Sequence, residues 1–175
     1  MIKDDRQNGI EKMRGMRETG GFPYDIRWAK VEDWEPAMKM IWRTFLRFEA
    51  SDYSEEGIRN FLDFITDEKL FHAFLRGDYQ MMVAVDGEQL VGAASVRNRN
   101  HLSLLFVDEP YHRQGIGRCL LDCFCAYLKD EAGESYMSLQ AAPYAVGFYL
   151  KIGFRAVSPE EEIGGIRVTS MEKYF

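Results

Sequence analysis

Apolar residues recur along the first half of the chain with spacings that predict one strand followed by helices. Residues 25–29 alternate polar and apolar side chains as a half-buried strand does. Two later runs repeat apolar residues every three or four positions, which is typical of amphipathic helices. These apolar positions are Met38, Ile41, Trp42, Phe45 and Phe48, and then Ile58, Phe61, Leu62 and Ile65. Ser54 is suited to cap the second helix, and a short helical segment is expected around residues 70–74.

The second half of the chain predicts a strand hairpin and then alternating helices and strands. Residues 79–85 and 89–96 are β-rich runs on either side of Asp86-Gly87, a pair that suits a tight turn with positive φ. Residues 102–107 form a short apolar run, which predicts a buried strand. The remaining predicted elements are a helix from Ile116 to near Gly133, a strand over 136–139, a helix from Pro143 to Gly153, and strands near 154–157 and 166–174.

Composition places this pattern in a single globular domain. The chain has 175 residues, of which 46% are hydrophobic and 29% are charged, enough for one core and too few for two ordinary domains. Its net charge of -6 argues against a nucleic-acid or anionic-membrane partner, because such partners require a basic face. No apolar run reaches the length of a membrane span, and charged residues follow Met1, so a cytoplasmic protein is expected.

Two further features limit the interpretation. Residues 1–24 are polar and contain scattered glycines, which predicts an N-terminal extension of unknown role before a domain over 25–175. The cysteines, Cys119, Cys123 and Cys125, lie within one predicted helix and lack paired C-x-x-C spacing. We therefore expect buried thiols and no metal site.

A glycine-containing loop joins the predicted strand at 102–107 to the next helix. Its residues are His112, Arg113, Gln114, Gly115, Ile116, Gly117 and Arg118. Free N–H groups and the dipole at a helix N-terminus can bind phosphate, and Arg113 and Arg118 add positive charge. The loop lacks the G-x-x-x-x-G-K-[ST] pattern and the third glycine of a dinucleotide fingerprint. From these residues alone, phosphate binding and a plain glycine turn that starts a helix are equally supported.

The stretch from Leu104 to Leu121, LLFVDEPYHRQGIGRCLL, resembles the acetyl-CoA-binding segment of the GNAT superfamily of N-acetyltransferases. In that family the loop begins with Gln or Arg, so His112 departs from the pattern, whereas residues 113–117 fit it. Residues 148–154, FYLKIGF, resemble the family's second signature. The resemblance covers residues 25–175. It implies an α+β fold with a mixed, mostly antiparallel sheet flanked by helices and two splayed central strands that hold the cofactor's pantetheine arm.

The resemblance also implies an activity, which is transfer of an acetyl group from acetyl-CoA, as co-substrate, to a primary amine of a small molecule or peptide in a ternary complex. No metal is expected. The cofactor is expected to contact loop residues 112–118 and the backbone of Leu105, Phe106 and Val107. Tyr149 is expected to protonate the leaving thiolate, with an aromatic core role as the alternative. His101 stands where the family places a glutamate base and is expected to act directly or through water. Its alternative is a strand-end histidine bonded to a loop.

The acceptor pocket is expected between the loop 49–53 and the acidic run 160–162, because acids beside aromatic rings suit a cationic amine. Gln140 is expected to replace an asparagine that is frequent in the family, and His72 receives no role. Two other functions remain open: a non-catalytic acetyl-CoA-binding module, and an acetyltransferase for protein N-termini or lysines. The acceptor's identity and the oligomeric state, with a homodimer as one option, are not predicted.

Overall fold

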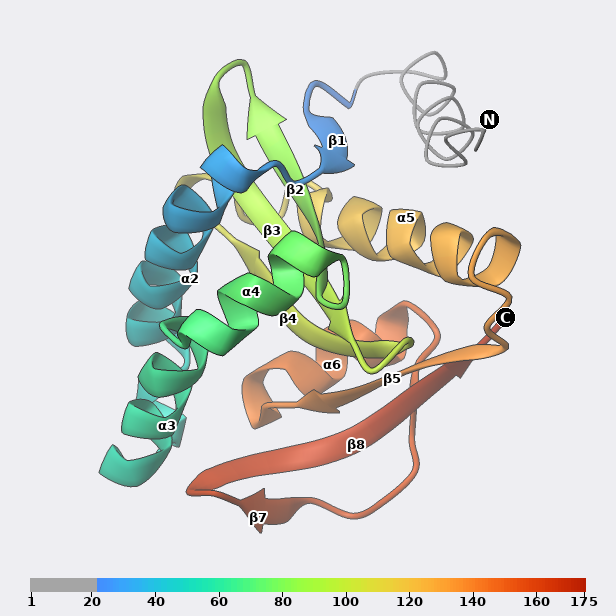
Figure 1. The fold of residues 1–175 in the computed structure, drawn as a ribbon. Helices are drawn as coiled ribbons and strands as arrows, with labels where there is room; N and C mark the ends of the chain where they lie inside the picture. The colour runs from blue at the N-terminus through green and yellow to red at the C-terminus, as the bar shows by residue number, and fades with distance from the viewer. Residues whose placement is uncertain (1–21) are drawn as a thin grey trace.

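The computed structural model describes residues 22–175, which form one eight-stranded sheet covered by helices (Figure 1). Across the sheet the strands follow the order β1-β2-β3-β4-β5-β8-β6, and β7 pairs with β8 outside this path. The strands are β1 Asp25–Trp28, β2 Gln80–Asp86, β3 Gln89–Arg97, β4 His101–Val107, β5 Tyr136–Ala141, β6 Arg155–Ala156, β7 Glu161–Ile163 and β8 Ile166–Tyr174. Every pair is antiparallel except β4 with β5. The predicted mixed, mostly antiparallel sheet is confirmed.

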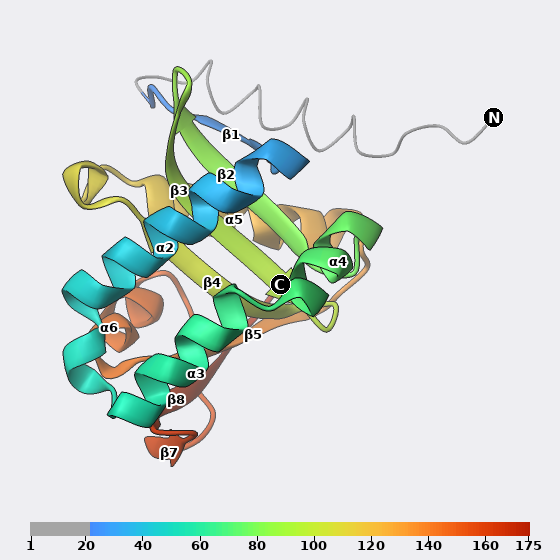
Figure 2. The same cartoon turned by 60° about the vertical axis from the view of Figure 1, so that its left-hand side comes forward.

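Helices cover both faces of this sheet. The helices are α2 Trp34–Phe48, α3 Glu55–Ile65, α4 Glu68–Arg76, α5 Ile116–Asp130 and α6 Pro143–Lys151, and the short 3-10 turns are η1 Val31–Asp33, η2 Ala50–Asp52 and η3 Glu109–Tyr111. Helices α2, α3 and α4 lie on one face, and α5 lies on the other (Figure 2). Helix α6 packs on β5 and β8, toward the end of the sheet farthest from β1.

Each face of the sheet has its own apolar core, because successive strand residues point to opposite faces. On the α2 face, Ile41 and Phe45 pack with Val83 of β2, and both helix residues are fully buried. On the α5 face, Leu120 and Phe124 are fully buried in a second cluster. Burying one such side chain stabilises a fold by about 1.5–3 kcal/mol. The two clusters hold β4, which lies between them, in a fixed position.

The helix cap and the turn that the sequence predicts lie at the expected ends of these elements. The Ser54 hydroxyl accepts a hydrogen bond from the Gly57 N–H at 3.1 Å, which caps α3. Residue Gly87 has φ of 60° in the turn between β2 and β3, a conformation that favours glycine. The hairpin, the strand before the glycine loop and the helices on either side of β5 all appear where the pattern predicts them.

Some features differ from the sequence interpretation or fall outside the described residues. Strand β7 was not predicted, because its residues are all exposed and show no apolar alternation. Of the predicted extension 1–24, residues 1–21 lie outside the described part, and Tyr24 is buried with its hydroxyl donating to Gln114. The cysteines carry free thiols, but only Cys123 is buried as expected, whereas Cys119 and Cys125 are half-buried. Within residues 22–175, no helix is long and apolar enough to cross a membrane.

Candidate functional site

A cleft of about 810 Å³ opens beside β4. Its walls come from the end of α2, from β4, from the loop before α5, from the end of β5 and from α6. These segments are far apart in the sequence, so the cleft forms only when the domain folds. It brings the glycine loop 112–118 and Tyr149, the two motifs singled out in the sequence, into one cavity.

At one end of the cleft, the glycine loop presents the N-terminus of α5. The first intrahelical hydrogen bond runs from the Cys119 N–H to the Gly115 carbonyl at 2.9 Å, so the preceding N–H groups have no acceptor within the helix. Gly115 has φ of 86°, a left-handed conformation that costs other residues about 1–2 kcal/mol.

The start of α5 also packs closely on the sheet at Gly92 of β3. A methyl group on Gly92 would lie only 2.9 Å from Cγ2 of Ile116. The small residue therefore lets α5 pack closely on the sheet.

Two polar side chains of the loop hold the loop itself in place. The Nε2 atom of His112 lies 2.7 Å from the Val107 carbonyl oxygen and therefore donates to it. Gln114 accepts from the Tyr24 hydroxyl and donates to the Pro110 carbonyl at 3.2 Å. At the place where this sequence departs from the family pattern, histidine thus fastens the loop to the end of β4.

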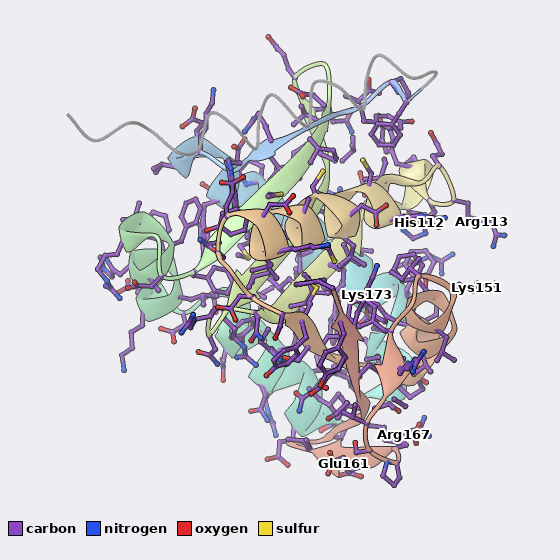
Figure 3. All side chains as sticks on the ribbon, turned by 90° about the vertical axis from the view of Figure 1, so that its right-hand side faces the viewer. His112, Arg113, Lys151, Glu161, Arg167 and Lys173 are labelled. Atoms are coloured by element: carbon purple, nitrogen blue, oxygen red, sulfur yellow. The ribbon has the colours of Figure 1, made fainter. Side chains whose placement is uncertain are left out.

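Three cationic side chains surround the same end of the cleft. Arg113 and Arg118 are exposed and line it, and Arg118 lies 3.7 Å from Asp122 one turn further along α5. Lys151, at the end of α6, also lines the cleft, although no sequence motif singled it out. Figure 3 shows Arg113 on the loop and Lys151 on the neighbouring helix α6. Helix N–H groups with cations around them form a suitable site for phosphates.

The floor of the cleft is a gap between two central strands. Strands β4 and β5 pair only through His101 with Ser138 and Leu102 with Leu139. The register between β3 and β4 skips Ser103 at this point, and such a bulge bends a strand. Residues 105–107 pair with β3 along one edge and face the cleft along the other. The splayed strands predicted from the resemblance are present.

Tyr149 extends from α6 into the cleft with its ring buried. It is 8% exposed, and its ring packs edge-on against Phe154 with the centroids 5.5 Å apart. Among residues 22–175, no group makes a hydrogen bond to its hydroxyl. Burial and the nearby Glu49 carboxylate raise the pKa of the Tyr149 phenol. The hydroxyl is therefore protonated at neutral pH and is available to a ligand.

Glu49, directly after α2, is the only carboxylic acid among the described residues that line the cleft. Burial raises the pKa of its carboxyl to about 7, against the opposing effect of the Tyr53 hydroxyl, which donates to it at 3.5 Å, while Asp52 raises it further. A carboxyl with this pKa exchanges protons readily at neutral pH. Sequence reasoning placed Glu49 in the acceptor wall but did not identify it as a base, because a single glutamate at a helix end has no distinctive pattern.

His101 lies outside the residues that line the cleft. Its Nδ1 atom is 2.9 Å from the Ser138 hydroxyl, and its cross-strand neighbour is Arg97. Burial, and then the charge of Arg97, lower its pKa. It lies at the start of β4, as the alternative interpretation of a strand-end histidine expects, but its partner belongs to strand β5 and not to a loop. The base role of His101 stays a prediction.

Other residues named in the sequence have simpler surroundings. Gln140 lines the cleft from β5. Residues 160–162, expected to share the acceptor wall, do not line it, and Glu160 instead lies 3.6 Å from Arg167. His72 is exposed on α4. In the described part of the chain, no cluster of three or more His, Cys, Asp or Glu residues is arranged to hold a metal.

Comparison with known proteins gives a consistent result. The family model of the acetyltransferase (GNAT) domain matches residues 49–175. A Bacillus subtilis (strain 168) protein classed as an acetyltransferase is 32% identical over 112 residues, which are 62% of this chain and 76% of that protein. The crystal structure of a GCN5-related N-acetyltransferase from Rhodopseudomonas palustris matches with a TM-score of 0.74 and 25% identity, over 86% of this chain and 94% of that one.

A second solved structure has the same fold at lower identity. The PaiA N-acetyltransferase of Thermoplasma acidophilum, solved in complex with coenzyme A, has a TM-score of 0.73 and 24% identity, over 87% of this chain and 99% of that one. The fold with its splayed β4 and β5, the glycine loop at α5 and a family match over residues 49–175 agree with one another. The chain belongs to the GNAT family of acetyltransferases.

Proposed function

We propose that this protein transfers an acetyl group from acetyl-CoA directly to a primary amine of a small molecule or peptide, in a ternary complex and without a metal. The observation that carries the proposal is one cleft with an anion site at one end, an open strand edge along its floor, and Tyr149 with Glu49 on its walls. The family membership supports acetyl transfer, and the arrangement of these groups supports the amine acceptor.

The cleft has the features that acetyl-CoA requires. The N–H groups at the start of α5, with Arg113, Arg118 and Lys151, would hold its pyrophosphate. The cleft-facing edge of residues 105–107, apart from the Val107 carbonyl that His112 already binds, would hydrogen-bond the pantetheine amides, as a neighbouring strand would. Bound acetyl-CoA supplies an acetyl group activated as a thioester. A methyl group on Gly117 would touch other side chains no closer than 3.7 Å, so this position leaves room for a ligand.

The side chains of the cleft provide the proton transfers. Glu49 takes a proton from the incoming ammonium, which would otherwise be neutral in only about one molecule in a thousand at pH 7. Backbone N–H groups of β4 donate to the carbonyl oxygen as the amine nitrogen forms its bond to the acetyl carbon. The carbon–sulfur bond breaks, Tyr149 gives its phenol proton to the thiolate, and the second proton that the nitrogen loses restores the phenol. The proton held by Glu49 passes to solvent. The products are the acetylated amine and free coenzyme A.

Coenzyme A should raise the melting temperature of the protein, because a ligand that binds only the folded state stabilises it. At one hundred times Kd, the stabilisation is about 2.7 kcal/mol, which corresponds to roughly 5–10 °C for a chain of this size. Differential scanning fluorimetry gives the shift, and a thiol-release assay with a panel of amines gives the turnover. Absence of both at millimolar cofactor would remove the proposed function. Binding without turnover of any acceptor would indicate a non-catalytic module.

The Glu49→Gln variant should lose the acidic limb of the pH–rate profile. In the wild type, kcat/KM should rise through a pKa near 7, because Glu49 accepts a proton only as the carboxylate and its pKa is raised to about 7. The glutamine side chain cannot ionise, so kcat/KM of the variant should be lower by about 10²-fold or more at pH 8. The remaining pH dependence should be that of the amine substrate, which loses its proton near pH 10.

His101→Ala is the matched control for this experiment. If Glu49 is the base, the limb near pH 7 persists in His101→Ala with a nearly unchanged rate. Loss of the limb in His101→Ala, with Glu49→Gln retaining it, would return the base role to His101. Tyr53, Asp52 and Tyr149 also face Glu49. The melting temperatures of Glu49→Gln and His101→Ala should therefore be compared with that of the wild type, to show that neither substitution disturbs the packing of these residues.

A further inference from the structure

The charges along the cleft are segregated. The cationic residues that line it, Arg113, Arg118 and Lys151, belong to the loop before α5, to the first turn of α5 and to the end of α6. Figure 3 shows His112, Arg113 and Lys151 in this region, well away from Glu161 and Arg167 on the β7–β8 hairpin. The remainder of the lining includes a group that we call the acceptor half: Thr44, Glu49, Tyr53, Phe61, Ser103 and Phe106. Of the six residues of this half, Glu49 is the one carboxylic acid, and none is an arginine or lysine.

Three arginines on the surrounding elements are paired with acids. Arg43 of α2 lies 2.8 Å from a carboxylate oxygen of Asp108. Arg47 lies 3.5 Å from Glu109, on the loop before α5. Arg167 of β8 pairs with acids on both sides, Asp52 at 3.8 Å and Glu160 at 3.6 Å. None of these three arginines lines the cleft. A carboxylate on the acceptor would therefore find no free partner among these three arginines.

The walls around Glu49 are aromatic. The Phe61 ring stacks on Phe45 with the centroids 4.1 Å apart, and it lies 6.0 Å from the Phe106 ring. Tyr53 packs edge-on against Phe45 at 4.9 Å. Apart from Glu49, the polar groups of this half are hydroxyls. One of them is the Thr44 hydroxyl, whose only hydrogen-bond partner among residues 22–175 is the Met40 sulfur, 3.7 Å away. Such a surface fits an apolar or aromatic group and one cation.

We infer, as an extension of the proposed function, that the acceptor is a primary amine on an uncharged, apolar or aromatic body, and that Glu49 excludes amines with an adjacent carboxylate. An α-carboxylate would lie close to Glu49 in a site shielded from water, and like charges in such a site repel strongly. A second ammonium group would gain little, because Asp52, the next acid, is paired with Arg167. The inference therefore disfavours free amino acids and polyamines alike.

A matched series of acceptors tests this inference. Thiol release should be measured with 2-phenylethylamine, phenylalanine, phenylalaninamide and spermidine at saturating acetyl-CoA. We expect kcat/KM for phenylalanine to be at least about 100-fold below that for phenylethylamine. Phenylalaninamide, which replaces the carboxylate with a neutral group, should regain most of this loss. Spermidine should be at least about tenfold poorer than phenylethylamine.

Glu49→Gln separates the charge effect from the shape of the site. Its absolute rates should fall, but the phenylalanine-to-phenylethylamine ratio should shrink to less than about tenfold, because the repelling charge is gone. Titration calorimetry with the coenzyme A-loaded protein gives the same comparison without catalysis. Turnover of phenylalanine or spermidine equal to or above that of phenylethylamine would overturn the inference and leave the acetyltransferase proposal intact. No thiol release with any acceptor would overturn the proposed function, and the inference with it.

Discussion

Replacing Tyr149 with phenylalanine should lower kcat by about 10²- to 10⁴-fold and leave the dissociation constant of coenzyme A nearly unchanged. The variant keeps the ring that packs on Phe154 and removes only the hydroxyl. That hydroxyl has no hydrogen-bond partner among the described residues, so its loss should leave the melting temperature almost unchanged. Steady-state kinetics, cofactor titration and thermal melting on one preparation give all three values.

Tyr144→Phe is a suitable control for this experiment. Tyr144 lies on the same helix and also lines the cleft, but it is 57% exposed. Removing the Tyr144 hydroxyl should change kcat by less than about threefold. Coenzyme A is itself a fair leaving group, because thiols have a pKa near 8.5. If Tyr149→Phe also loses less than about threefold, water serves as the proton donor and Tyr149 acts as a packing residue.

Replacing Gly117 with glutamate should weaken coenzyme A binding by at least about 100-fold. The added carboxylate would lie at the start of α5, where the pyrophosphate would bind, and would compete for the same N–H groups and cations. Gly117 suits this test better than Gly115. Its backbone is helical, and a methyl group there meets other side chains no closer than 3.7 Å, whereas Gly115 has positive φ. The substitution should therefore leave the fold intact.

Gly117→Gln has nearly the same size as the glutamate variant without its charge. It should bind coenzyme A much more tightly than Gly117→Glu, so the difference between the two measures electrostatic exclusion. Isothermal titration calorimetry gives both dissociation constants, and circular dichroism shows whether the helix content is retained. If glutamate and glutamine weaken binding equally, steric blockage is the cause. If neither weakens it, the phosphates bind elsewhere.

Features that depend on neighbouring residues in the sequence were predictable. The glycine loop, the hairpin turn at Asp86-Gly87 and the cap at Ser54 each need a few adjacent residues with defined backbone preferences. The apolar spacing of α2 and α5 follows from the helical repeat. These local rules were sufficient for the order of most elements. They also located the loop that forms one end of the cleft.

Features that arise from packing between distant segments were not predictable in this way. The raised pKa of Glu49 depends on burial and on Tyr53 and Asp52 around it, and the same glutamate on an open helix end would look identical in the sequence. Strand β7 forms through backbone pairing with β8, and its three side chains are all exposed. Its sequence therefore has no alternation of apolar and polar residues that would predict a strand. The position of His101 relative to the cleft follows from where β4 and β5 separate, at Ser103.

The separation of β4 from β5 has a consequence for solubility. A strand edge with free N–H and C=O groups can pair with strands of other chains and so lead to aggregation. Proteins usually shield such edges. Here the edge of residues 105–107 that is not paired with another strand lies inside the sheet, where it faces a cleft with α2 and α6 on its walls and where His112 binds the Val107 carbonyl. An edge strand of another protein is part of a sheet, which is too wide to enter this cleft. A thin, flexible ligand can enter it. The domain can thus keep an unpaired edge for its ligand with little risk of aggregation through that edge.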